Sequence, residues 1–430
     1  HLLSRRQRQM CIRDRIRTLV MRNLLYGLLL PFLWGCTSQG NKSQSGFALE
    51  TSEDVSMLPI SVENGINIRV GSPLPEIKAS ELIDDYKYIP LETNSESFMG
   101  QLHNVIFYED NLYVHDIEGN MICIFDRNGR YLNKVGIQGD GPGQFSTLLQ
   151  DVIIDPFAKR MMIYDQGLGK ILYFSLKGDY LFSRNMHLRI NGDFQMISPN
   201  QILTYQAKCR HNVHLGEMDS YRIIMLDSLL KVSGYGHLYD DNTNSNYSPP
   251  VFPHSNEGVL YNPIFTTDFY SITPKSIDLK YHLDYTNFGN PINPDKVAEL
   301  DDRKKIIDYL FSTTHTMIKP VETVDFFLFR TYSQSNDNRF YTYYDKKAKR
   351  NLSFRKIIPD IDFAFDYILS NCDDYIVGEV NISTLRTLAE LCKQGSVKGK
   401  KENLEMIEKL NDDDNSVLVL FKLKPLKQHE

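Results

Sequence analysis

Residues 112–132 read LYVHDIEGNMICIFDRNGRYL, and residues 161–181 read MMIYDQGLGKILYFSLKGDYL. Three landmarks recur in them at one offset of 49 residues: Asp116 and Asp165, Gly129 and Gly178, Tyr131 and Tyr180. Self-similarity at a fixed period of this length is typical of propellers and solenoids, in which each unit buries its faces against its neighbours. The sequence therefore predicts a series of similar β units.

Each unit has the pattern of four antiparallel strands. An apolar strand ends at Asp, whose side chain can bond turn amides. A second strand leads into a hairpin turn at Asn128-Gly129 or Lys177-Gly178, and a third follows the turn. The fourth strand is Val105–Tyr108 in the first unit and Val152–Ile154 in the second. Four antiparallel strands are the blade of a β-propeller.

Apolar runs continue the series as far as Lys424. They are Tyr221–Asp227, Phe269–Ile272, Phe326–Arg330, Arg339–Asp345, Tyr375–Glu379 and Val417–Leu423. Helical spacing predicts insertions at residues 295–311, 385–391 and 402–410, with Ser383 as a cap and Gly395 as a stop. Roughly 360 residues in units of this length, with the insertions allowed for, predict six blades. We expect the last strand to pair near the N-terminal end and close the ring.

The glycine-rich stretch Val135–Phe145 lies between the first two units. Its composition resembles a phosphate-binding loop, but no Gly-Lys-Ser/Thr and no helical pattern follows it. We therefore interpret it as a crossover between blades, where glycines permit tight backbone turns.

The N-terminal region is predicted to be separate from the folded domain. Residues 1–20 are basic without periodicity and are interpreted as a non-native leader. Residues 21–35 are predicted to be a signal peptide that ends in Leu33-Trp34-Gly35 before Cys36. This order resembles the bacterial lipobox, in which the Cys is lipidated, although Trp34 replaces the usual small residue. Residues 36–65 are predicted to be a flexible tether.

Composition and charge exclude several classes of protein. The hydrophobic share of 42% and the charged share of 24% are typical of a globular protein. No run approaches the roughly 18 apolar residues of a membrane-spanning helix. The net charge is −6, and because a net six positive charges precede Cys36, it is −12 from Cys36 onward. Such an acidic chain is not expected to bind nucleic acid. The cysteines show no zinc-binding spacing, and Cys123 is predicted to be a buried thiol.

These features together resemble a known family. They are a lipobox, a tether, Tyr88–Thr93, Leu112–Asp116, Phe125–Gly129, Gly139–Phe145 and a closing Val417–Leu423. The chain is similar to six-bladed β-propeller lipoproteins of Bacteroides-like bacteria, which are related to NHL-repeat and TolB-like propellers. The resemblance implies an all-β propeller over residues 66–425, held by a lipid anchor in the outer membrane and facing the periplasm. It carries no established activity.

Candidate site residues are few. Candidates for ligand binding at a propeller mouth are His103, Asp151, His211, His214 and Glu379. His211 and His214 have a metal-like spacing but no third ligand nearby in the sequence. An axial calcium site would need several oxygen ligands, and the possible ones are Asp116, Asp151, Asp155, Asp165, Asp193 and Glu379. Because Asp116 and Asp165 recur with the repeat, we interpret them as structural turn residues, and no metal ligand is assigned.

Two main functional hypotheses remain open. The favoured one is a binding module for an envelope peptide, glycan or protein, because no catalytic set is evident. The alternative is a calcium-dependent lactonase or esterase-like hydrolase with its site at the propeller axis; no other cofactor is implied. A third is a structural envelope protein. Contact with the membrane is expected through the lipid anchor only.

Overall fold

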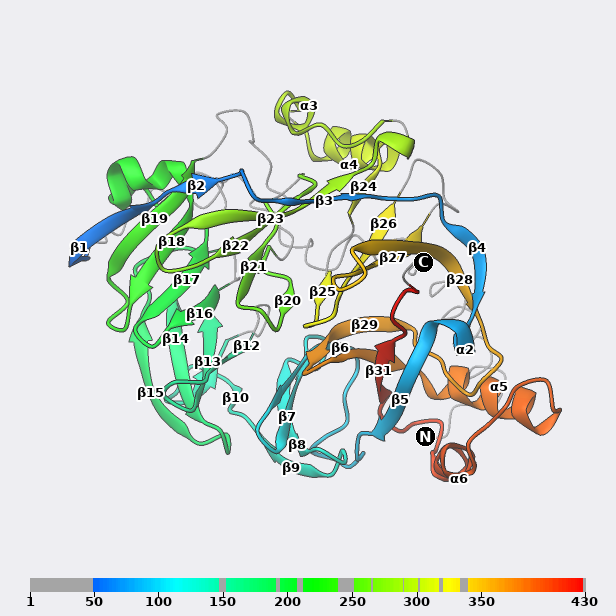
Figure 1. The fold of residues 1–430 in the computed structure, drawn as a ribbon. Helices are drawn as coiled ribbons and strands as arrows, with labels where there is room; N and C mark the ends of the chain where they lie inside the picture. Colours follow the sequence, from blue (N-terminus) through cyan, green and yellow to red (C-terminus); the bar gives the residue numbers. More distant parts are fainter. Residues whose placement is uncertain are drawn as a thin grey trace. The chain divides into compact units, whose positions relative to one another are not determined.

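Runs of β-branched and aromatic residues, separated by turns rich in Asp, Asn and Gly, form strands from Thr51 to Leu423. The computed structural model is shown in Figure 1. It describes residues 49–146, 152–190, 194–206, 212–238, 251–263, 266–288, 290–300, 302–316, 320–332 and 339–427. All of these belong to one compact unit, Gly46–Glu430.

The two repeated sequence units form two four-stranded antiparallel sheets. The first consists of β6 (Leu102–Tyr108), β7 (Asn111–Asp116), β8 (Met121–Asp126) and β9 (Tyr131–Lys134). The second consists of β12 (Val152–Asp155), β13 (Arg160–Asp165), β14 (Lys170–Ser175) and β15 (Tyr180–Asn185). The register is the same in both, since Asp116 pairs with Met121 and Asp165 pairs with Lys170. The four-stranded unit predicted from the repeat is confirmed.

Three further sheets contain four antiparallel strands. One has β16 (Phe194–Ser198), β17 (Gln201–Tyr205), β18 (Tyr221–Asp227) and β19 (Val232–Leu238). Another has β25 (Val321–Glu322), β26 (Phe326–Tyr332), β27 (Phe340–Asp345) and β28 (Arg350–Ile358), with β24 (His315–Thr316) also on β26. The third has β29 (Tyr367–Cys372), β30 (Tyr375–Val380), β31 (Val417–Leu423) and β5 (Ile83–Pro90).

The remaining large sheet has only three antiparallel strands, β21 (Val259–Tyr261), β22 (Asp268–Ile272) and β23 (Ile277–Asp284). The short strand that precedes it, β20 (His254–Ser255), pairs in parallel with β25 of the next sheet. The prediction of a six-bladed propeller is therefore wrong. The fold is an all-β propeller with five four-stranded blades. Chain length and repeat period could not reveal this, because the partner of β20 is a strand more than sixty residues away.

Strands from the two ends of the described chain close one blade. β31 lies between β30 and β5, and its pairing with β5 runs from Val417 opposite Pro90 to Leu423 opposite Ile83. The predicted pairing of the last strand with the N-terminal end is confirmed. Figure 1 shows β31 and β5 side by side.

Four N-terminal strands add parallel outer edges to three other sheets. β1 (Thr51–Leu58) pairs with β19, β2 (Ile60–Ser61) and β3 (Ile66–Arg69) pair with β23, and β4 (Leu74–Lys78) pairs with β28. A short helix, α2 (Ala79–Leu82), then leads into β5. The segment 36–65, predicted as a flexible tether, thus contributes β1 and β2 from its second half. These strands cover edges that would otherwise present unpaired backbone groups.

Helices occupy the predicted insertions. They are α3 (Pro294–Ala298), α4 (Arg303–Ser312), α5 (Ile382–Lys393) and α6 (Lys401–Lys409), with short 3₁₀ segments η2 (Val213–Ser220) and η3 (Thr286–Phe288). The prediction that Ser383 caps the second insertion is wrong, because α5 already begins at Ile382. Asp366 accepts the Asn381 amide there at 2.7 Å. Gly395 ends the helix with a φ of +75°, as predicted.

The innermost strands link successive sheets. β6 contacts β12 and β29, β12 contacts β16, and β25 contacts β29. Between the first two sheets, Tyr113 and Ile124 pack with Ile163 and Leu172 in one buried cluster. Each sheet therefore buries its faces against its neighbours, as the repeat predicted.

The glycine-rich stretch is a crossover, as predicted. It forms a small parallel pair, β10 (Ile137–Gln138) with β11 (Gln144–Phe145), in which the Gly139 amide donates to the Phe145 carbonyl at 2.9 Å. The Gln144 side chain accepts the Gly141 amide, so this loop satisfies its own backbone groups.

Candidate functional site

The structure describes three of the six residues that the sequence singled out. Cys36, Asp151 and His211 lie outside the described residues, as does Asp193. His103 lies in β6, His214 in η2 and Glu379 in β30. The three belong to three different sheets or their connections, so no common site forms among them.

His103 lies beside a second histidine that the sequence did not single out. The rings of His103 and His115 meet edge to face, with centroids 5.3 Å apart. His115 is buried in β7, next to Asp116. His214 is part of the 3₁₀ segment η2, and burial lowers its pKa. It is therefore neutral at pH 7.

The recurring aspartates are turn residues, as predicted. The carboxylate of Asp116 accepts four backbone amides, those of Gly100, Gln101, Glu118 and Gly119. Asp165 accepts the amide and hydroxyl of Ser146 and the amide of Leu168. Among the described residues, no group of three or more His, Cys, Asp or Glu side chains is arranged to hold a metal ion.

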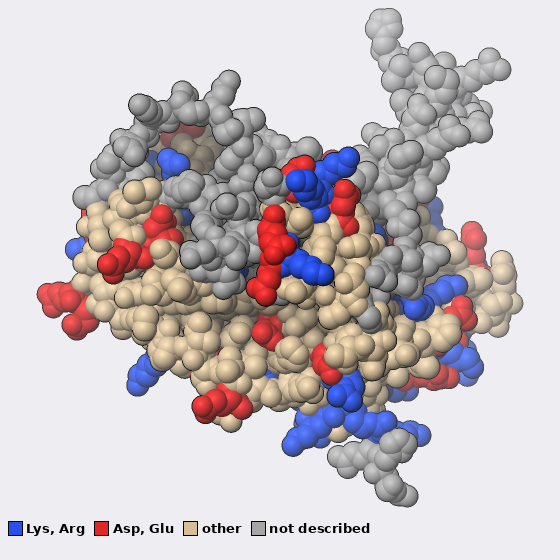
Figure 2. Space-filling view, turned by 90° about the horizontal axis from the view of Figure 1, so that it is seen from above, with Lys and Arg blue, Asp and Glu red and all other residues tan. Residues whose placement is uncertain are grey.

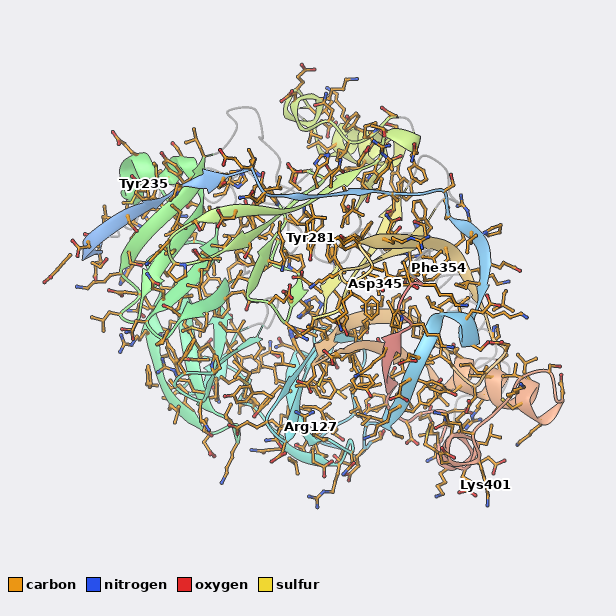
Figure 3. The ribbon with its side chains drawn as sticks, in the orientation of Figure 1. Arg127, Tyr235, Tyr281, Asp345, Phe354 and Lys401 are labelled. Atoms are coloured by element: carbon orange, nitrogen blue, oxygen red, sulfur yellow. The ribbon has the colours of Figure 1, made fainter. Side chains whose placement is uncertain are left out.

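A buried charge cluster joins the β21–β23 sheet to the next blade. Its centre is Glu322 of β25, whose side chain is 0% exposed. Lys280 of β23 and Lys346, which follows β27, approach its carboxylate at 2.7 and 3.0 Å. Tyr281 donates its hydroxyl to the same carboxylate at 2.6 Å. Figure 3 labels Tyr281 and Asp345, which mark the two sheets that this cluster connects.

Every charge of this cluster has a partner. Glu257 accepts both lysines at 2.8 Å, and Ser255 donates to Glu322 at 2.6 Å. Burial acts to raise the pKa of Glu322, but Lys280 and the hydrogen bonds outweigh burial and bring the pKa below its usual value. We call Glu322, Lys280, Lys346 and Glu257 the paired cluster and assign it a structural role.

The opposite end of the same blade carries two arginines. Arg330 pairs with Tyr341 between β26 and β27, and Arg339, just before β27, comes opposite Tyr332 if the register continues. Directly opposed residues share one face of a sheet, so these four side chains lie on one face. Diagonal neighbours on such a face are about 7–8 Å apart. The two guanidinium groups are therefore close to each other.

Neither arginine forms an ion pair with another residue in the described part of the chain. The Nε atoms of Arg330 and Arg339 are buried and have no hydrogen-bond partner among the described residues. Burial, and then the charge of Arg330, lower the pKa of Arg339. Arg330 lies over the ring of Tyr341, 5.3 Å from its centroid, which is a favourable cation–π contact. The pair is thus left with mutual repulsion.

The adjacent blade contributes Tyr367 to the same region. Tyr367 begins β29 and pairs across strands with Glu379 of β30. Burial raises the pKa of Tyr367, as do Asp366 and Glu379, whereas Arg330 lowers it. The charged groups of Asp366, Glu379 and Arg330 therefore lie close enough to the Tyr367 hydroxyl to affect its pKa. Tyr367 is 48% exposed, so the region is open to solvent. We call Arg330, Arg339, Tyr332, Tyr341 and Tyr367 the arginine site.

The aromatic residues behind the site fix its shape. Tyr341 stacks on Phe354, labelled in Figure 3, with centroids 5.9 Å apart. It also meets Phe365 edge to face at 5.9 Å. Figure 2 shows basic and acidic side chains interspersed on the visible face rather than gathered by sign. Attraction of an anion to the arginine site would therefore depend on these placed groups rather than on a broad basic surface.

The candidate residues chosen from the sequence include Glu379 but neither Arg330 nor Arg339. A sequence feature does mark the two arginines. Arg330 interrupts the apolar run FFLFRTY, and Arg339 begins the aromatic run RFYTYYD. Arginine in a strand pattern of aromatic residues is unusual unless it is paired. Only the hairpin register, however, brings the two positions together.

The arginine site has the composition of an oxyanion receptor. Guanidinium groups bind carboxylates, sulfates and phosphates through two parallel hydrogen bonds. An anion bound between Arg330 and Arg339 would relieve the repulsion between their guanidinium groups.

Removing one arginine is expected not to destabilise the fold. Arg339→Gln eliminates the repulsion with Arg330, so the free energy of unfolding should stay unchanged or rise by up to about 1 kcal/mol. Urea denaturation in buffer free of multivalent anions measures this. A loss of more than about 1 kcal/mol would instead assign Arg339 a structural role.

Two sequence comparisons bear on the chain. The family model described as "Domain of unknown function (DUF4934)" matches residues 64–422. None of the curated proteins matches the chain. The matched range covers all the strands from β3 to β30 and most of β31.

The same fold is found in a solved structure. A protein from Bacteroides fragilis described as exported superimposes with a TM-score of 0.70 at 16% identity, over 84% of this chain and 100% of that one. A member of the DUF4221 family from Bacteroides vulgatus gives a TM-score of 0.46 at 10% identity, over 80% and 98% of the two chains. In the described part of this chain, no helix has the length and apolar character needed to cross a membrane.

Proposed function

The chain belongs to the DUF4934 family of unknown function, and we propose that it is an exported β-propeller that binds a partner through an acidic group of that partner. The arginine site is the binding site. The partner is a peptide, glycan or protein of the cell envelope that carries a carboxylate or another oxyanion.

The proposed location rests on two observations. Residues 21–36 have the order of a lipoprotein signal, with Cys36 as the lipidated residue. The structural neighbour from Bacteroides fragilis is described as exported. We infer an envelope location with a lipid anchor at Cys36, in the outer membrane and facing the periplasm. Two or more acyl chains would hold the domain there firmly, whereas one chain would not.

One observation carries the binding proposal. The half-buried lysines of the paired cluster each contact two carboxylates, whereas Arg330 and Arg339 form no ion pair with another described residue. A half-buried pair of like charges is unfavourable for folding, and an anionic ligand that offsets the repulsion would account for its presence. The tyrosines around the pair give that ligand an aromatic surface, as is common in ligand sites.

Binding should require both arginines. On an array of defined peptides and glycans, half of them bearing a carboxylate or sulfate, we expect the full chain to retain acid-bearing members only. The double variant Arg330→Gln/Arg339→Gln should bind them at least tenfold more weakly, because a hydrogen bond to a charged group contributes about 1.5–3 kcal/mol.

The matched control is Arg350→Gln. Arg350 is an exposed arginine at the other end of the same blade, where it donates to the Lys427 carbonyl. This variant makes the same chemical change and should bind as the unmodified chain does. Retention of neutral members alone, or binding unchanged in the double variant, would refute the proposal.

A further inference from the structure

We propose that the outer edge of β15 (Tyr180–Asn185) is a second interaction surface, on which an extended segment of a partner protein is added as a parallel strand. That segment alternates apolar and acidic side chains. We call these six residues the β15 edge. They lie in a different blade from the arginine site of β26 and β27, and the inference does not depend on the proposed function.

The chain already adds parallel strands to the outer edges of other blades. β1 pairs with β19, β3 with β23 and β4 with β28, so successive N-terminal strands cover successive sheets. In the described part of the chain this series begins at β1, and the preceding sheet ends at β15, whose strand neighbour is β14. A strand added to β15 would extend the same series by one blade.

The β15 edge has the local geometry of the edge that accepts β1. In both sheets the register with the inner neighbour shifts beside the first pair, which is Phe174 with Tyr180 in one and Leu226 with Val232 in the other. The Val232 amide points outward and donates to the Glu50 carbonyl at 2.9 Å. Tyr180 has the equivalent position, so its amide is directed toward the place that a carbonyl of an added strand would occupy.

Two further residues of β15 direct their backbone groups outward. Met186, just after the strand, donates its amide inward to the Gly169 carbonyl at 2.8 Å. Neighbouring residues of an antiparallel strand direct their backbone groups to opposite sides, so Ser183 and Asn185 direct theirs away from β14. Outward backbone groups of this kind provide the hydrogen bonds through which an edge strand pairs with another chain.

The repeat-equivalent edge of the first blade differs from the β15 edge. In β9, the outer strand of that sheet, Tyr131 and Leu132 correspond to Tyr180 and Leu181 of β15. The Tyr131 amide, however, donates to the Glu92 carboxylate at 2.9 Å, and β9 has four residues rather than six. We therefore assign the surface to β15 and use β9 as its control.

The apolar side chains of the β15 edge favour apolar residues in the added strand. Leu181 is 48% exposed and Tyr180 is 36% exposed. Edge strands of soluble proteins often carry lysine or proline, which oppose pairing with another chain, and β15 contains neither. Phe182 stacks on Tyr173 with centroids 4.4 Å apart, which fixes the strand in place and lowers the entropic cost of pairing.

Two cations favour acidic residues in the same segment. Arg184 lies over the Phe182 ring at 5.6 Å, and Lys170 of β14 is opposite Asn185. Neither cation forms an ion pair with another residue in the described part of the chain. Because adjacent residues of a strand point to opposite faces, an acidic side chain on either face would find a cation. A second copy of β15 would instead bring like charges together, so an acidic segment of another protein is the better partner.

Titration of the full chain with three end-blocked nonapeptides tests this inference. The first alternates valine and glutamate, the second is the same peptide with its backbone amides N-methylated, and the third has lysine in place of glutamate. We expect the first to bind, and the N-methylated peptide to bind at least about tenfold more weakly because its backbone donors are lost. The lysine peptide should bind at least about threefold more weakly than the first.

One matched pair of variants assigns the binding to β15. Leu181→Asp should weaken binding of the valine–glutamate peptide at least about tenfold, because it places an acidic group beside the added strand. Leu132→Asp makes the same change at the equivalent, similarly exposed position of β9 and should leave binding unchanged. Arg330→Gln/Arg339→Gln removes the arginine site, so binding that persists in this double variant is independent of that site.

Hydrogen exchange of residues 180–185, measured by mass spectrometry, identifies the surface. The outward amides of Tyr180, Ser183 and Asn185 should exchange rapidly in the free chain and at least about tenfold more slowly with the valine–glutamate peptide. Slow exchange of these amides in the free monomer would show that the chain itself covers the edge, and it would overturn the proposal.

The remaining outcomes also decide between occupants. Absence of peptide binding, binding that N-methylation does not weaken, or equal effects of Leu181→Asp and Leu132→Asp would each overturn the proposal. A dimer in sedimentation equilibrium that Leu181→Asp dissociates would overturn it in favour of pairing with a second copy. None of these results bears on the proposed function, which is tested by the dependence of acid binding on Arg330 and Arg339.

Discussion

Glu322→Ala is expected to lower the free energy of unfolding by about 3–5 kcal/mol. The substitution leaves Lys280 and Lys346 next to each other without their buried acceptor, and it also deprives Tyr281 of its hydrogen-bond partner. Glu257 still contacts both lysines, but the two half-buried ammonium groups lose the fully buried carboxylate that lies between them. Urea denaturation at neutral pH measures the change.

Two further variants show whether charge is the cause. Glu322→Gln keeps the side-chain shape and should retain most of the loss. Glu109→Gln breaks an exposed pair with Lys159, in which both side chains are largely in solvent, and should cost less than about 1 kcal/mol. Similar losses for Glu109→Gln and Glu322→Gln would contradict the special role of the paired cluster.

The contribution of the Glu322 carboxylate to the free energy of unfolding depends on pH. Its pKa in the folded protein lies below the usual value of 4.5, so its contribution to stability is present above that pH. The contribution is lost as the pH falls from about 4.5 through the lower, folded-state pKa. The stability difference between the unmodified chain and Glu322→Gln should therefore shrink on acidification over this range.

Gly129→Ala is expected to destabilise the protein by about 3 kcal/mol or more. Gly129 has a φ of +85°, and a Cβ atom there would come within 1.9 Å of the Pro90 carbonyl oxygen in β5. That contact is with backbone of the closing strand, so no side chain can move aside. Thermal and urea unfolding of the variant measure the loss.

Two other glycines provide a graded control. Gly169 has a φ of +61° with no atom within 4 Å of its Cβ position, so Gly169→Ala should cost only about 1 kcal/mol for the backbone conformation. Gly178, the repeat partner of Gly129, would meet Asn133 at 3.2 Å and should fall between the two. Equal losses at Gly129 and Gly169 would show that contact with β5 is unimportant.

These glycines show what the repeat could and could not predict. Gly129 and Gly178 occupy the same turn because turn chemistry is local, and the 49-residue offset identifies it correctly. Their surroundings differ because Gly129 lies against β5, a strand from another blade. The same limit explains the wrong blade number, since the partner of β20 is set by packing between sheets.

The candidate site shows the same difference between local features, which the sequence predicts, and contacts between distant segments, which it does not. Glu379 could be found because it lies near the end of a recognisable strand. Arg330 and Arg339 could not, because their proximity depends on the register of β26 and β27 across a connection of unknown geometry. The paired cluster was missed for a similar reason, since its four charged residues come from separate segments of the chain.

The pairing of β5 with β31 determines when the ring of blades can close during folding. On the ribosome β5 emerges before the antiparallel strands of the other four blades, and β31 is synthesised about 330 residues later, after every other described strand. Until β31 has been synthesised, β5 lacks its antiparallel partner and the ring of blades cannot close. A chain whose ring closes only when its last strand is available can cross a membrane before folding is complete. It would then close the ring after translocation.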